Sequence, residues 1–159
     1  MAELTTVQLW TDGACSGNGR NGPSPGGWAA ILAVGPHTKK LSDGEPDTTN
    51  NRMEILAVLE GLRALDRRCH VQIHTDSQYV IDACTRWMPG WRRRAWKTSS
   101  GDPVKNRELL EALDVQLKQH QVEWVKVKGH SGNPLNELAD QMAVAACERY
   151  GGSGKRRSG

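Results

Sequence analysis

The chain has 159 residues, of which 37% are hydrophobic and 25% charged, and its formal net charge is +3 at pH 7. This length suits one soluble globular domain with a single core. No stretch approaches the roughly 20 apolar residues that a membrane span requires, so we expect no membrane association.

The cysteines and the N-terminus bear on the cellular compartment. No two cysteines form a C-x-x-C pair, and reduced thiols are favoured over the disulfides that an even number would permit. The scattered positions are Cys15, Cys69, Cys84 and Cys147. Residues 1–4 lack the charged start and apolar core of a signal peptide. We therefore expect a cytoplasmic protein.

Two stretches each predict a short strand that ends in Thr-Asp: residues 7–13 (VQLWTDG) and residues 71–77 (VQIHTDS). If the two strands are parallel neighbours, Asp12 and Asp76 lie together at their carboxyl ends. Ligands bind at that edge in open α/β sheets. Because adjacent carboxylates repel each other, such a pair indicates a metal ion or a shifted pKa.

A glycine-rich loop, two strands and a helix are predicted between these stretches. The loop at residues 13–27 lacks the ending of a phosphate-binding P-loop. Strands at 28–34 and 38–41 follow, and the short connections make the first three strands antiparallel neighbours. Thr49 or Asn50 caps a helix that extends to about Asp66. Glu54 is expected in its first turn, where an acid is commonly a partner of the helix dipole.

The second half predicts alternating strands and helices. A helix carrying Tyr79 to Cys84 follows the strand at 71–75, and this order predicts a parallel strand pair with a right-handed crossover. An amphipathic helix at about 106–120, a strand at 122–127 and a last helix carrying Asp140 come next. Residues 1–150 are expected to form one domain, with a disordered basic tail at 151–159.

Four acids from four separate elements are candidate metal ligands: Asp12, Glu54, Asp76 and Asp140. Carboxylate oxygens suit Mg²⁺ or Mn²⁺, and the sequence lacks the thiolate or histidine spacing of a zinc site. Two such ions can activate a water and stabilise a leaving oxygen. The spacing alone leaves open that these acids are ordinary surface groups. His130 is a candidate general acid or base, or an ordinary loop histidine.

A stretch at residues 87–97 interleaves three tryptophans with four cations. Aromatic rings can stack on bases or sugars while Arg and Lys neutralise phosphates, so the pattern favours nucleic acid binding. The alternative is a packed helix with a solvated basic face. The candidates are Trp87, Trp91, Arg92, Arg93, Arg94, Trp96 and Lys97, with Lys105 shortly after them.

The chain resembles type 1 ribonuclease H from about residue 7 to residue 150. The motifs that carry the resemblance are TDG at 11–13, TNNRME at 49–54, TDSQY at 75–79, GW at 90–91 with WKT at 96–98, and GHSG at 129–132 with NE at 136–137 and Asp140. It implies a ribonuclease H-like mixed sheet of five strands, three antiparallel and two parallel, flanked by helices. It also implies one catalytic domain with a basic protrusion at about residues 87–105.

The resemblance further implies a role for each candidate residue. The four carboxylates would hold two Mg²⁺ ions, for which Mn²⁺ can substitute, and His130 would assist proton transfer or product release. The residues expected to read the RNA strand are Asn18, Asn50, Asn51 and Gln78. Those expected to hold the DNA strand are Thr49 and Asn106 at a phosphate, and Trp87 and Trp96 in a groove of the basic protrusion.

The activity implied is hydrolysis of the RNA strand of RNA/DNA hybrids by a monomer. The expected products carry 5′-phosphate and 3′-hydroxyl ends, with little sequence preference. Two alternatives stay open at this point: a DNA nuclease of the same fold, and a hybrid-binding module without catalysis.

Overall fold

Five strands form one mixed sheet in the computed structural model, which describes residues 4–16, 24–128 and 133–151. β1, β2 and β3 pair antiparallel, whereas β4 pairs parallel with both β1 and β5. In the order in which they lie, the strands are β3 (His37–Glu45), β2 (Gly26–Val34), β1 (Thr5–Cys15), β4 (Cys69–Thr75) and β5 (Gln121–Lys126). The predicted five-stranded architecture is confirmed.

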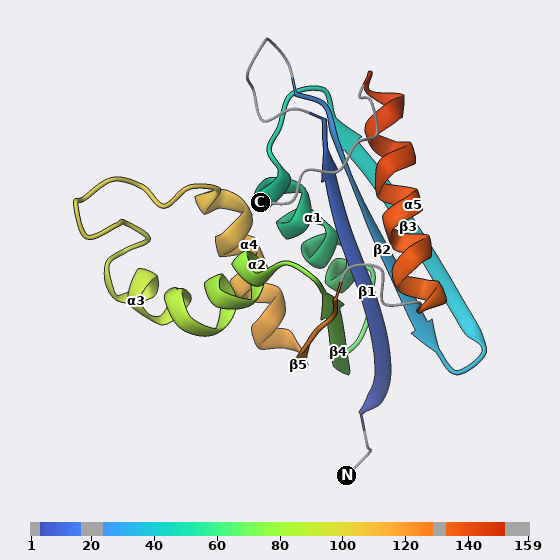
Figure 1. Ribbon diagram of the computed structural model, residues 1–159. Coiled ribbons are helices and arrows are strands. Elements are labelled where there is room, and N and C mark those ends of the chain that lie inside the picture. Colours follow the sequence, from blue (N-terminus) through green and yellow to red (C-terminus); the bar gives the residue numbers. More distant parts are fainter. Residues whose placement is uncertain (1–3, 17–23, 129–132, 152–159) are drawn as a thin grey trace.

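Helices cover both faces of this sheet (Figure 1). α1 (Asn50–Arg63) and α4 (Arg107–Gln119) lie on one face, and α5 (Pro134–Arg149) lies on the other, over β1, β2 and β3. Among the described helices, none combines the length and apolarity that a membrane crossing needs. The predicted ends of two elements differ by three or four residues: α1 ends at Arg63 and not at about Asp66, and β3 continues past residue 41 to Glu45 because its pairing with β2 reaches Gly26.

β1 contributes to two cores because successive side chains of a strand point to opposite faces. Leu9 packs with the core on the α1 side, and Trp10 packs on the α5 side. On that second side Gly27 of β2 lies directly under α5: a Cβ there would be 2.3 Å from the Ala143 carbonyl oxygen and 2.4 Å from the Cys147 nitrogen. The absence of a side chain at Gly27 therefore sets how closely α5 docks.

The basic protrusion is built on a run of consecutive helical segments. α2 (Gln78–Asp82), the π-helical segment η1 (Ala83–Trp87) and α3 (Met88–Arg93) follow one another beside the sheet (Figure 1). The chain then turns through Ala95 and Trp96, whose φ angles of 55° and 62° cost roughly 1 kcal/mol each in residues other than glycine. The buried Trp96 side chain offsets this strain, since it packs into the main core.

An ion pair fastens α3 to α4. The Arg92 guanidinium lies 2.6 Å (Nη2) and 3.1 Å (Nε) from Oδ1 of the buried Asp114, and Lys118 approaches Oδ2 at 3.4 Å. Burial acts to raise the pKa of Asp114, but the hydrogen bonds and charge of Arg92, together with Lys118, outweigh burial and lower it. Asp114 is therefore ionised when folded, and Arg92 serves as an anchor of the protrusion.

Gly27→Ala is expected to lower the free energy of unfolding by about 1–3 kcal/mol, because the new methyl group must displace α5 backbone. Urea unfolding followed by circular dichroism measures this. Gly90→Ala is the matched control, since the nearest atoms there belong to the flexible end of Arg94, and alanine favours the helix. Equal stability of the two variants would contradict the close docking of α5.

Asp114→Asn is expected to lower the free energy of unfolding by about 2 kcal/mol at pH 7, where a charged hydrogen-bond acceptor is lost. The folded pKa of Asp114 lies below its usual value of 3.8. Its contribution is thus complete above that value and is lost as the pH falls through the lowered pKa. The difference from wild type should shrink below about pH 4. Urea titrations from pH 3 to pH 7 test this, with the exposed Asp102→Asn as control; a pH-independent difference would contradict it.

Candidate active site

Asp12 and Asp76 are brought side by side by the parallel register of β1 and β4. The last ladder pair is Trp10 with His74, and two residues further on the same register sets Asp12 opposite Asp76. Asp12 is buried within β1, whereas the half-buried Asp76 directly follows β4. Ser77 then caps α2 by accepting the Val80 N–H at 3.2 Å, which fixes where the chain leaves the sheet. The prediction that these acids come from neighbouring parallel strands is confirmed.

Glu54 reaches the same edge from α1. The expectation that it lies in the first turn is wrong: Thr49 caps the helix, the helix begins at Asn50, and Glu54 is its fifth residue. The residue is only 4% exposed. It is therefore buried at the sheet edge where Asp12 and Asp76 lie, and it is not a solvated partner of the helix dipole. Gly13 permits this approach, since a Cβ there would lie 2.9 Å from the Glu54 nitrogen.

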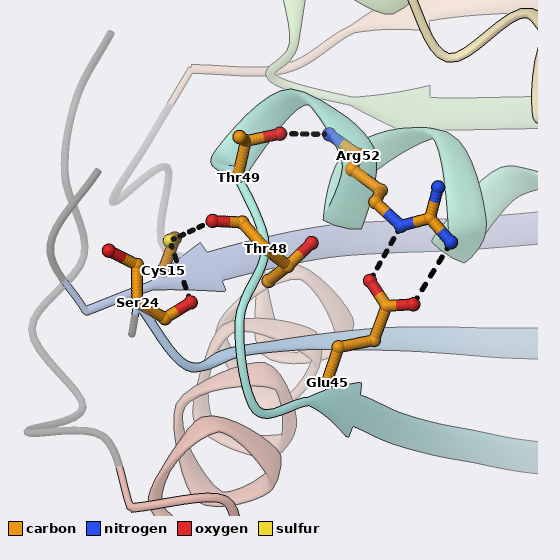
Figure 2. A network of polar contacts seen from close by, with 6 residues as sticks. All are labelled: Cys15, Ser24, Glu45, Thr48, Thr49 and Arg52. Carbon is orange, nitrogen blue, oxygen red and sulfur yellow. Dashed lines mark hydrogen bonds and ion pairs between the residues drawn. The ribbon is translucent and has the colours of Figure 1, made fainter. Parts of the chain in front are cut away.

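Polar contacts hold the beginning of α1 and the residue before its cap to the ends of β1 and β3. Figure 2 shows Thr49 accepting the Arg52 N–H, at 3.2 Å, while the Arg52 guanidinium donates to both carboxylate oxygens of Glu45 at 2.7 and 3.0 Å. In the same view the Cys15 thiol donates to the Thr48 carbonyl oxygen at 3.6 Å. These contacts tie the first turn of α1 to the ends of β1 and β3, and so fix the start of the helix that carries Glu54.

The three carboxylates form one group. An oxygen from each of Asp12, Glu54 and Asp76 lies within 4.8 Å of the other two. Oxygens on opposite sides of an octahedral Mg²⁺ are about 4.2 Å apart, so the spacing is close to that of a shared cation. The donors are oxygen only, which fits Mg²⁺ or Mn²⁺ and not a thiolate-preferring metal.

The electrostatics of this group favour a cation. Burial raises the pKa of Glu54 well above its usual range, and the charge of Asp76 with a hydrogen bond between the two acids raises it further. Burial also raises the pKa of Asp76; the Lys126 charge opposes this, and the charge of Asp140 adds to it. Burial and the Asp76 charge therefore favour the protonated form of Glu54 in the absence of metal. A divalent cation would reverse this preference, since it stabilises both ionised carboxylates.

Asp140 completes the set from the opposite face of the sheet. It lies in α5, is half-buried, and is near enough for its charge to act on Asp76. It stands outside the close three-carboxylate group. The four predicted acids thus meet at one edge, three in contact range and the fourth beside them.

Several candidate substrate-binding residues lie at the starts of helices. Asn50 and Asn51 open α1, and Gln78 opens α2, where its amide donates to Asp82 at 3.0 Å. Asn106 precedes α4 with a left-handed φ of 59°. It hydrogen-bonds the Tyr79 hydroxyl group, and this contact links the start of α4 to α2. Asn18 and His130 lie outside the described residues, so their placement stays a prediction.

The tryptophans and cations of the protrusion divide into two kinds. Trp87, Trp91 and Trp96 form a chain of ring contacts with centroids 5.9 and 6.0 Å apart, of which Trp87 is the exposed end and Trp96 the buried one. Arg92 is engaged by Asp114. The other exposed cations of this segment are Arg93, Arg94, Lys97 and Lys105. Trp91 and Trp96 thus pack against the core and Arg92 is ion-paired, whereas Trp87 and the other cations leave an exposed aromatic and basic surface beside them.

Two charged residues near the site were not among the predicted site residues. The Lys126 ammonium group lies at the end of β5 and donates to the Asp76 backbone oxygen at 2.8 Å. Arg52 clamps the start of α1 through Glu45. The two-residue period of β5 puts Lys126 on the same face as Val122 and Trp124, so no local signal pointed to a contact with Asp76.

Comparison with known proteins identifies the family. The family model described as RNase H matches residues 5–148. The ribonuclease H of Bordetella avium is 56% identical over 137 residues, which cover 86% of this chain and 87% of that protein. The ribonuclease H of Dechloromonas aromatica is 50% identical over 152 residues, covering 96% of this chain and all of the relative.

Solved structures agree with these relatives. LC9-RNase H1, described as a type 1 RNase H with the type 2 active-site motif, superposes with a TM-score of 0.83 at 34% identity, covering 100% of this chain and 79% of that one. LC11-RNase H1, solved in complex with an RNA/DNA hybrid, has a TM-score of 0.62 over 90% of this chain and 97% of its own, and at 19% identity it supports the fold alone. A match over residues 5–148 and relatives that are at least half identical show that the chain belongs to the RNase H family, and the prediction of a type 1 ribonuclease H is confirmed.

Proposed function

We propose that this ribonuclease hydrolyses the RNA strand of RNA/DNA hybrids with two metal ions, Mg²⁺ or Mn²⁺, bound at the carboxylate edge. The observation that carries the proposal is the group of Asp12, Glu54 and Asp76, whose oxygens lie within 4.8 Å of one another in a partly buried site. Such an arrangement is unfavourable without cations and favourable with them.

The chain's own residues would hold the ions and assist the transfer of a proton. Asp12, Glu54 and Asp76 would hold the ions, with Asp140 beside Asp76 as a fourth ligand. When bound, the two ions would lower the pKa of the attacking water and stabilise the leaving 3′-oxygen. Attack on phosphorus in line would leave 5′-phosphate and 3′-hydroxyl ends. His130 remains our proposal for proton transfer or product release.

The RNA strand would be read by amides at the starts of α1 and α2. Asn50, Asn51 and Gln78 lie there, beside Glu54 and Asp76 in the chain, and Asn18 is proposed to join them. The minor groove of a hybrid is wide and shallow and displays 2′-hydroxyl groups, which short polar side chains can contact. Because 2′-hydroxyl groups are common to all ribonucleotides, little sequence preference is expected.

The DNA strand would lie along the protrusion. Thr49 and Asn106 are proposed to hold a phosphate, while Trp87 offers an exposed ring. Trp91 and Trp96 would support that ring through their contacts with it and with each other. The exposed cations Arg93, Arg94, Lys97 and Lys105 would neutralise further phosphates. LC11-RNase H1, which shares this fold, was solved in complex with an RNA/DNA hybrid.

The organisation of the whole chain stays part of the proposal. Residues 1–150 would form a single catalytic domain that acts as a monomer in the cytoplasm. The basic tail at 151–159 was predicted to be disordered, and all but Gly151 lies outside the described residues.

Asp12→Asn is expected to reduce hybrid cleavage at least about 100-fold while hybrid affinity changes little, because it removes a metal ligand and leaves the substrate surface intact. Gel assays with labelled RNA/DNA hybrid in Mg²⁺ measure cleavage, and fluorescence anisotropy in EDTA measures binding. Asp66→Asn, an exposed acid beyond the end of α1, is the control and should behave as wild type.

The same assays separate the alternatives. Equal cleavage of a hybrid and the matching DNA duplex by wild type would identify a DNA nuclease of the same fold. Binding without cleavage in either Mg²⁺ or Mn²⁺ would identify a hybrid-binding module. Normal activity of Asp12→Asn would refute the two-metal assignment.

Replacing both Arg93 and Arg94 by alanine is expected to weaken hybrid binding and to reduce the slope of log K against log salt by about 1.8, since each lost phosphate contact contributes about 0.9. Arg92→Ala should instead lower stability with a nearly unchanged slope, because Arg92 is engaged by Asp114. Arg63→Ala, a cation at the far end of α1, is the control. An unchanged slope in the double variant would show that these arginines are solvated surface groups that contact no phosphate.

A further inference from the structure

One cation sits at the carboxylate edge without being part of the candidate ligand set. Lys126 is the last residue of β5, and in the parallel ladder it pairs with Thr75, the residue before Asp76. Its ammonium group donates to the Asp76 backbone oxygen at 2.8 Å. This bond holds a positive charge beside the carboxylate group while the amine remains on the solvent side.

The position of this charge matters because the site concentrates negative charge. Asp12, Glu54 and Asp76 gather within 4.8 Å, and two of them are almost fully buried. Charge interactions strengthen as the groups leave water, so a partly buried site magnifies the effect of each charge. A fixed ammonium group therefore offsets part of the repulsion among these acids, and the same charge repels any incoming cation.

We propose that Lys126 is a positioning residue that serves as the resident cation of the metal-free site: it lets the carboxylates assemble before metal binds and weakens the binding of divalent ions. The inference rests on the proposed metal site and adds to it a residue that acts through the ligands. The Lys126 charge would therefore stabilise the metal-free protein and destabilise the metal-bound one.

Two substitutions separate the charge from the hydrogen bond. Lys126→Gln removes the charge but keeps a donor that can bond the Asp76 oxygen. Lys126→Arg keeps both the charge and a donor. Lys40→Gln removes an exposed lysine from β3, which is separated from β4 by two strands, and is the matched control.

The first measurement is calorimetric titration of Mn²⁺ into the protein in the absence of nucleic acid. Lys126→Gln is expected to bind Mn²⁺ about three- to tenfold more tightly than wild type, while Lys126→Arg and Lys40→Gln stay within about twofold. Equal affinity of Lys126→Gln and wild type would overturn the proposal. So would a Lys126→Arg variant that binds as tightly as Lys126→Gln, because the charge would then have no effect.

The second measurement is thermal unfolding in EDTA and in saturating Mn²⁺. Lys126→Gln should melt below wild type in EDTA, and the difference should shrink or reverse with Mn²⁺, because a ligand that binds the native state more tightly stabilises it more. A difference that is the same in both conditions would mark a merely structural lysine and contradict the proposal.

The same data distinguish this inference from the proposed function. If wild type binds no Mn²⁺, the metal site itself is wrong and the role of Lys126 fails with it. If wild type binds Mn²⁺ and Lys126→Gln binds equally, only the role of Lys126 is wrong. A variant with unchanged metal affinity but a raised KM for hybrid would assign Lys126 to substrate contact, which also overturns the proposal.

Discussion

Repulsion among buried carboxylates is the constraint around which this molecule is arranged. Asp12 and Asp76 lie opposite each other because β1 and β4 pair in parallel, and Glu54 joins them from the start of α1. Burial strengthens every charge interaction among the three and raises the pKa values of Glu54 and Asp76. A site of this kind is electrostatically unfavourable, and the cations of the proposed function would relieve the repulsion.

The surrounding structure holds this unfavourable group in place. Gly13 lets α1 approach β1, and the Arg52–Glu45 ion pair fastens the first turn of α1 to the end of β3. On the other face, Gly27 lets α5 dock closely and bring Asp140 to the same edge. Close backbone contacts and a paired arginine thus resist the separation that like charges would otherwise cause.

The protrusion combines packed and exposed side chains in one basic segment. Arg92 turns inward to Asp114 and Trp96 packs into the core, so these residues hold α3 and the following turn against the body. Arg93 and Arg94 stay exposed next to them. Neighbouring arginines therefore differ in their surroundings, because Arg92 contacts the buried Asp114 across the α3–α4 contact and the other two are exposed.

The sequence by itself determined the strand alternation, the Thr-Asp endings, the capped start of α1 and the identity of the four acids, because these depend on local periodicity, capping and motif spacing. It misplaced Glu54 within its helix, since a cap at Thr49 or at Asn50 suits the same residues. Only the tertiary structure decided that Lys126 stands beside Asp76 and that Arg92 is an anchor. Both depend on contacts between residues 50 and 22 positions apart, and no local pattern encodes which charges such contacts bring together.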